Sequence, residues 1–163
     1  MPDTGNPPQG TAPSGAQPGV FIDPYRAYNF KLQIQGVTDG QGHFTACSGL
    51  GIKVEVIKYR EGGNQVTYNI PGQVKYSDIT LRYGLTSSRE IWDWLMSAVE
   101  GPKQVQRKNV TIQMLDTDGV GEVMRWNLEH AWISEWCGAR LDALSSEVAI
   151  ESLTLVYETL HRA

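Results

Sequence analysis

The sequence lacks the features of a membrane protein and of a disulfide-rich secreted protein. Its only cysteines, Cys47 and Cys137, lie far apart without C-x-x-C spacing, so we expect two small buried hydrophobic residues and no disulfide framework. No apolar run is long enough to span a bilayer, and residues 1–19 have neither the basic nor the apolar region of a secretory signal. We therefore expect a chain that is made in the cytoplasm and has no direct membrane anchor.

Positive charge is also scarce. The chain holds 14 Lys and Arg against 18 Asp and Glu, a formal net charge of −4. The clustered cationic excess of a nucleic-acid-binding module is missing. What remains is the composition of a soluble globular protein of 163 residues, of which 40% are hydrophobic and 20% charged.

The N-terminal segment differs in composition from the rest of the chain. Residues 1–19 are mainly Pro, Gly, Gln and Thr with almost no apolar side chains, which cannot offset the entropy of ordering, so we predict a flexible arm. Two interpretations stay open: an inert tail, or an arm that orders against a neighbour after assembly. Residues 20–24 mark a boundary, and residues 20–163 are predicted to form a single domain.

The clearest pattern in the chain is a long hairpin over residues 49–70. Ile52, Val54 and Val56 alternate with polar residues, as in a strand with one buried and one wet face. A turn at Gly62-Gly63-Asn64 follows, alternation resumes on the return strand, and Pro71-Gly72 is expected to stop it. Since its far end is charged, this hairpin is expected to reach beyond a small domain to something else.

The other elements predict a mainly β fold. Alternating residues indicate strands at 28–35, from 44, at 76–83, 110–114 and 124–136, and over a long run at 147–160. One helix is expected after a capping box at Ser87–Glu90, with Trp92 off its apolar stripe and exposed. Residues 139–146 resemble a crossing loop. One helix and about seven strands predict a closed or nearly closed antiparallel β-barrel or sandwich with a packed helix and a protruding hairpin.

Catalytic and metal-binding patterns in the sequence are weak. A zinc site from His43, Cys47, His130 and Cys137 lacks the usual short ligand spacings. Ser145-Ser146 lacks the glycine-flanked elbow of a hydrolase, and the loop from Asp116 to Gly119 lacks the terminal glutamate of a calcium site. We therefore expect no enzyme activity, no cofactor and no metal.

Three spaced motifs carry a family resemblance. They are FTACSGL at residues 44–50, the charged strand that ends in YREGGN, and the stretch at 84–94. Together they closely resemble the inner-tube protein of contractile injection systems and contractile-phage tails, which includes the haemolysin-coregulated-protein type, over nearly everything from Asp23 onward. One departure is that Ile133, Ser134 and Glu135 follow Trp132, where the family pattern has a proline and a basic residue.

The resemblance implies a structural subunit of a hollow inner tube that is driven through a target envelope. It implies hexameric rings that stack into a tube, with sheath, baseplate or spike and tube-terminating proteins as partners, and effector proteins or phage DNA in the lumen. It also implies assembly in the bacterial cytoplasm, in a particle that is cytoplasmic, membrane-attached or released. The predicted assembly interface comprises Leu50, Lys53, Glu55, Lys58, Arg60, Glu61, Gly62, Gly63, Asn64 and Trp92.

A function of another class is weighed beside this one. The tryptophans Trp92, Trp132 and Trp136, if exposed, would be stacking platforms of a monomeric carbohydrate- or peptide-binding β-sandwich. A stable monomer that binds a glycan would favour that alternative, whereas self-assembly would favour the tube.

Overall fold

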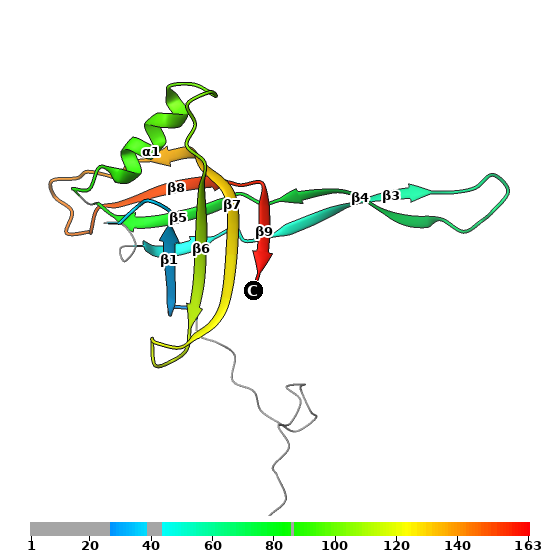
Figure 1. Ribbon diagram of the computed structural model, residues 1–163, viewed down its shortest axis with the longest axis horizontal. Helices are drawn as coiled ribbons and strands as arrows, with labels where there is room; N and C mark the ends of the chain where they lie inside the picture. The colour runs from blue at the N-terminus through cyan, green and yellow to red at the C-terminus, as the bar shows by residue number, and fades with distance from the viewer. Residues whose placement is uncertain (1–26, 39–43, 86) are drawn as a thin grey trace, which may run out of the picture.

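The computed structural model describes residues 27–38, 44–85 and 87–163 (Figure 1). The predicted arm at 1–19, the boundary at 20–24 and His43 lie outside these residues. The described part contains one helix, α1 (Glu90–Val99), and nine strands. The strands are β1 (Phe30–Ile34), β2 (Phe44–Ser48), β3 (Ile52–Tyr59), β4 (Tyr68–Tyr76), β5 (Ile79–Gly84), β6 (Lys108–Leu115), β7 (Glu122–Cys137), β8 (Ile150–Val156) and β9 (Thr159–Arg162).

An antiparallel sheet forms the body of the molecule, and it confirms the mainly β prediction. Its strands follow the order β1-β6-β7-β8-β5-β2, and β9 also pairs with β7. The two ends of this path, β1 and β2, do not pair with each other within the described residues. They nevertheless line one groove together, so the sheet curls until its ends face each other without closing by hydrogen bonds.

The last part of the chain differs from the single strand predicted over residues 147–160. It contains two strands, β8 and β9, separated by Tyr157 and Glu158. β8 pairs with the second half of β7, and β9 pairs with the first half. The alternation of Leu153, Leu155 and Tyr157 identifies one face of a strand. It does not show that β8 and β9 pair with different halves of β7, because strand pairing is set by contacts that are distant in sequence.

The long strand β7 joins the two halves of the sheet by means of two irregularities. Leu128 is buried, but the next buried residues are Ala131 and Ile133, because a bulge lies at Glu129-His130 and His130 has a φ of 55°. A second register shift between Ile133 and Glu135 precedes the pairing of Trp136 with Leu153. The strand predicted at 124–136 is present, but its inward positions change from even-numbered to odd-numbered residues beyond Leu128.

The core lies between the sheet and α1. Leu81, Leu128, Leu153 and Leu155 are fully buried, and α1 packs on β7 with Ile91, Trp94 and Leu95 inward. The Trp94 indole Nε1 donates to the Gln106 carbonyl at 2.7 Å, which satisfies the one polar atom of a large buried side chain. The sequence correctly predicts this helix and the burial of Ile91, Trp94 and Leu95, but Val99, predicted on the same apolar stripe, is 67% exposed.

The start of α1 differs from the predicted capping box. Arg89 is the N-cap residue and makes no side-chain cap bond. The Glu90 carboxylate instead accepts hydrogen bonds from the backbone N and the Oγ1 of Thr38, at 2.8 and 3.1 Å. Since Thr38 lies far away in sequence, this contact ties the end of the β1 segment to the helix start and takes the carboxylate away from its own backbone.

Candidate assembly interface

The hairpin β3–β4 stands out from the body of the molecule as a two-stranded ribbon (Figure 1). Its large apolar residues are exposed over both strands, between 43% for Ile70 and 62% for Val56. The sequence predicts one buried face for this ribbon, and that is wrong for the single chain, because the chain itself does not cover it. A set of exposed apolar side chains of this extent is typical of a surface that another protein covers.

The turn at the hairpin tip is formed as predicted. Tyr59 and Tyr68 make the last strand pair, and the Asn64 backbone N donates to the Glu61 carbonyl at 3.1 Å. Gly63 has a φ of +87°, in the left-handed region that favours glycine. The predicted stop at Pro71-Gly72 is wrong, because β4 continues to Tyr76. Pro71 is tolerated because β4 has no second strand partner in the described part of the chain.

A bulge in β4 moves the apolar surface of the hairpin from one face to the other. Val54 pairs with Val74 but Val56 pairs with Pro71, so β4 carries one extra residue opposite Glu55. Directly paired antiparallel residues share a face. The base face, near the body, therefore contains Ile52, Val54, Val56 and Val74, whereas the tip face, on the other side, contains Ile57, Tyr59, Tyr68 and Ile70.

The charged residues of the predicted interface are distributed along the same ribbon. Near the body, the Lys75 ammonium pairs with the Glu55 carboxylate on the side opposite the base face, and Lys53 pairs in register with Lys75. Lys58, Arg60 and Glu61 are exposed at the far half. The hairpin thus carries lysines in both halves, each on the side opposite the apolar surface of that half.

Leu50, 38% exposed, lies beside the opening between the two ends of the sheet. It lines a groove of about 360 Å³ together with residues of β1, β2, β6 and β7, among them Tyr28, Cys47, Met114 and Trp126. Burial raises the pKa of the Cys47 thiol to about 11. Cys47 is therefore a half-buried, protonated thiol, close to the prediction, whereas Cys137 is exposed and its predicted burial is wrong.

Trp92 is exposed as predicted, at 41%, but it lies on α1 and not on the hairpin. Its ring meets that of Trp136 edge to face, with centroids 5.2 Å apart. The structure therefore brings together the predicted residues from 53 to 64 on one ribbon, places Leu50 at its root, and leaves Trp92 elsewhere on the molecule (Figure 1).

One apolar surface is not predicted from the sequence. The connection between β7 and β8 carries Leu141, Leu144 and Val148, which are 82%, 98% and 78% exposed. The crossing-loop prediction at 139–146 is wrong, because this connection joins two neighbouring antiparallel strands. The sequence signal for this surface was the presence of three large apolar residues in one loop, because loop tips usually carry small polar residues.

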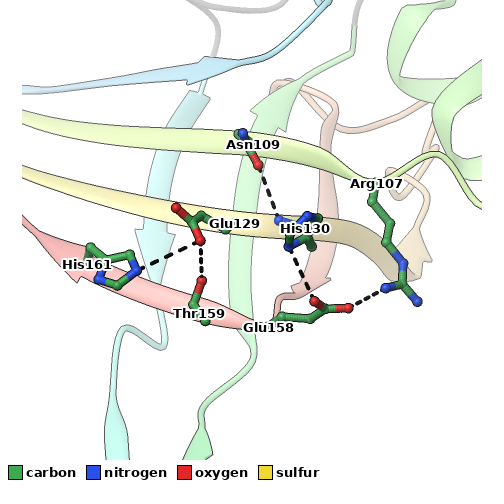
Figure 2. A network of polar contacts seen from close by, with 7 residues as sticks. All are labelled: Arg107, Asn109, Glu129, His130, Glu158, Thr159 and His161. Carbon is green, nitrogen blue, oxygen red and sulfur yellow. Dashed lines mark hydrogen bonds and ion pairs between the residues drawn. The ribbon is translucent and has the colours of Figure 1, made fainter.

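A polar network holds the C-terminal strand against the body (Figure 2). Glu158 contacts Arg107 and, at 3.3 Å, the His130 Nδ1. Glu129 accepts a hydrogen bond from the Thr159 Oγ1 at 2.8 Å and lies 3.8 Å from the His161 Nε2. Because the carboxylates face histidines on β7 and β9, these side chains connect strands. Within the described residues, no group of three or more His, Cys, Asp or Glu could hold a metal ion.

The residues that the structure describes include no helix that could span a membrane.

Several solved structures are similar to this chain. A chain of an extracellular contractile injection system, the PVC sheath-tube complex in its extended state, is 29% identical, with a TM-score of 0.75 over 86% of this chain and 91% of that one. A chain of the anti-feeding prophage cap, the AFP tube terminating cap, is 26% identical, with a TM-score of 0.77 over 88% and 93%. Hcp1 from Flavobacterium johnsoniae shares the fold at 13% identity and a TM-score of 0.50, over 82% and 93%.

A search of curated proteins gives no match. The family described as T4-like virus tail tube protein gp19 matches residues 26–161, which is nearly the whole chain. The chain therefore belongs to the family of the T4-like virus tail tube protein gp19, and it is a structural subunit of the tube of a contractile tail or injection system.

Proposed function

We propose that copies of this chain form hexameric rings, that the rings stack into a hollow tube, and that the β3–β4 hairpin joins the copies. The observation that carries the proposal is the exposure of apolar side chains on both faces of the hairpin, outside the body of the chain. Surfaces of this kind become stable when a second copy buries them. The sixfold number comes from the resemblance to the family.

The predicted interface residues take different parts in this proposal. Lys53 and Glu55 lie near the body on the side opposite the base face, and Lys58, Arg60 and Glu61 lie on the far half, where cations steer the approach of a neighbour. Gly62, Gly63 and Asn64 shape the tip. Leu50 lies at the root of the hairpin, where it lines the groove between β1 and β2. Trp92 contributes a separate contact on α1.

Residues 20–163 are proposed to act as one tube domain, with residues 1–19 as an arm that orders on assembly. The proposed partners are a sheath, a baseplate or spike and a tube-terminating protein; the related chains occur in a sheath-tube complex and in a tube-terminating cap. The lumen would conduct effector proteins or phage DNA. Assembly would take place in the bacterial cytoplasm. The subunit acts mechanically, without catalysis.

The alternative of a monomeric carbohydrate- or peptide-binding sandwich is not supported. It requires three exposed tryptophans, but Trp132 and Trp136 are half-buried and only Trp92 of the three is exposed. The family match is to tail tube proteins.

Negative-stain imaging and sedimentation of the purified chain over a range of concentrations test the proposal. We expect rings and tubes, and we expect Val54→Asp to abolish them, because it places a carboxylate within the base face. Val120→Asp is the matched control, since Val120 is 83% exposed in the turn between β6 and β7. A chain that stays monomeric at every concentration would contradict the proposal.

A further inference from the structure

The connection between β7 and β8 presents apolar side chains to solvent in a defined conformation. We call it the leucine loop and define it by Leu141, Leu144 and Val148, with the adjoining Leu85 and Ile150. The Leu85 backbone N donates to the Ala149 carbonyl at 3.0 Å, which holds these segments together. Leu144, at 98% exposure, has almost its whole surface in water.

Internal hydrogen bonds shape the leucine loop. The Asp142 Oδ1 accepts from the Leu144 backbone N at 3.0 Å, and the Asp142 carbonyl accepts from the Ser145 backbone N at 3.1 Å. The Ser145 Oγ accepts from the Glu147 backbone N at 3.1 Å. These turns fix the backbone while the leucines point outward. The exposure of the leucines is therefore a feature of an ordered loop.

The leucine loop and the hairpin lie at opposite ends of the molecule, along its longest axis (Figure 1). Each is an apolar surface that the chain does not cover itself. When two different surfaces at opposite ends of one subunit fit each other, copies associate head to tail and the contact repeats from copy to copy. A second copy of the chain is then sufficient to cover both surfaces.

The charges of the two surfaces are complementary. A hollow of about 460 Å³ beside the leucine loop is lined by the carboxylates Asp142 and Glu147, by Arg140, whose guanidinium lies 4.0 Å from the Asp142 carboxylate, and by the apolar side chains Val148 and Ile150. The far half of the hairpin carries Lys58 and Arg60 against Glu61. Lys58 alternates with Ile57 and Tyr59 and so lies on the side opposite the tip face, whereas Arg60 and Glu61 follow the last strand pair at the end of the ribbon. Each surface thus combines an apolar patch with an excess of one sign of charge, and the signs are opposite.

The two-sided hairpin requires two receiving surfaces. Because the bulge places the base face and the tip face on opposite sides of the ribbon, one partner surface cannot cover both. The base face is nearest to the body of its own chain, whereas the tip face is far from it (Figure 1). Because the tip face lies far from the body of its own chain, a surface on another copy is the better candidate to cover it.

We propose that the leucine loop of one copy receives the tip face of the hairpin of a second copy, with Glu147 near Arg60 at the end of the hairpin. This inference rests on the proposed self-assembly and adds the receiving surface.

Leu144→Asp in the full chain tests the apolar part of the contact. The concentration at which half of the chains are assembled should rise about tenfold or more, because a leucine buried in the interface becomes a carboxylate. The melting curve of the dissociated chain should stay unchanged, since Leu144 is exposed. The control Val120→Asp should assemble like the unaltered chain.

A charge exchange tests the polar part. Glu147→Lys and Arg60→Glu should each weaken assembly, and the double variant should regain most of it because opposite charges face each other again. Glu147 is chosen over Asp142 because the Asp142 side chain holds the loop turn.

Cross-linking identifies the contact directly. In a Cys137→Ser background, Ile57→Cys combined with Leu144→Cys should give a ladder of disulfide-linked multimers under oxidation, whereas Ile57→Cys with Val120→Cys should not. If the unaltered chain forms no assemblies, the proposed function fails. If it forms tubes and Leu144→Asp forms them equally well, the proposed function stands and the leucine-loop inference is overturned, as it would be for a loop that binds another protein.

Discussion

Ile57 lies over Gly72 across the hairpin: a Cβ at position 72 would stand 3.0 Å from the Ile57 Cγ1 and 3.1 Å from the Glu55 carbonyl oxygen. This is the place where β4 holds one extra residue and the apolar surface changes face. A side chain at position 72 would compete with Ile57 for the same space. The glycine thus permits the local geometry on which the two-sided hairpin depends.

Gly72→Val is therefore expected to impair assembly while the body of the chain keeps its stability. The added branches must displace Ile57 or the backbone at Glu55, which disturbs the tip face. Gln73→Val, at the neighbouring exposed position, is the matched control. Sedimentation and a thermal melt followed by circular dichroism separate the two effects; equal loss of body stability and assembly would show that the bulge serves folding of the body instead.

The two tip glycines are expected to differ. A Cβ added at either position would have no neighbouring atom within 4 Å, so space does not limit substitution. Gly63 has a φ of +87°, which strains a β-branched residue by about 1–2 kcal/mol, whereas Gly62 is not in that region. Gly63→Val should therefore weaken assembly more than Gly62→Val, and Gly63→Asn should restore much of the loss. Equal effects of the two valines would contradict a conformational cause.

The sequence predicts the hairpin and its turn because both are local features. Alternation in residues 52–56 and the Gly-Gly-Asn turn depend on neighbours in the chain. The missing cover of Val54 and the bulge at Gly72 could not be predicted, because the first depends on what the rest of the chain packs against and the second on the register of the partner strand. The stop expected at Pro71 fails for the same reason: a proline is allowed where the strand has a free edge.

The body shows the same limit. Alternation identifies Leu81 and Ile79 as core residues of β5, and the structure confirms both. It fails along β7, where the bulge at His130 moves the inward positions from Leu128 to Ala131. The contact between Glu90 and Thr38 likewise replaces a local capping pattern by a partner that is distant in sequence. Trp92 was assigned to the predicted interface only because it was expected to be exposed. Exposure alone does not show to which contact surface a residue belongs.

Stability of the body and assembly should separate in a pair of alanine variants. Leu155 is fully buried, so Leu155→Ala should lower the free energy of unfolding by about 2–5 kcal/mol through lost burial and a cavity. Val54 is 45% exposed in the single chain, so Val54→Ala should change unfolding of the dissociated chain little but weaken assembly. Chemical denaturation and sedimentation measure the two quantities. A large loss of single-chain stability in Val54→Ala would mean that the chain covers its own base face.

The two cysteines should differ in reactivity. Burial raises the pKa of Cys47 to about 11, so at pH 8 its reactive thiolate is suppressed well below that of an ordinary exposed thiol, and it becomes substantial only as the pH approaches 11. Cys137 is exposed at the end of β7. A maleimide reagent at pH 8 should therefore label the native chain once, rapidly, and Cys137→Ser should remove that fast reaction. Denaturant should make Cys47 react at the rate of a free thiol. If the Cys137→Ser variant is still labelled rapidly in its native state, the thiol of Cys47 is accessible and the groove between β1 and β2 does not shield it.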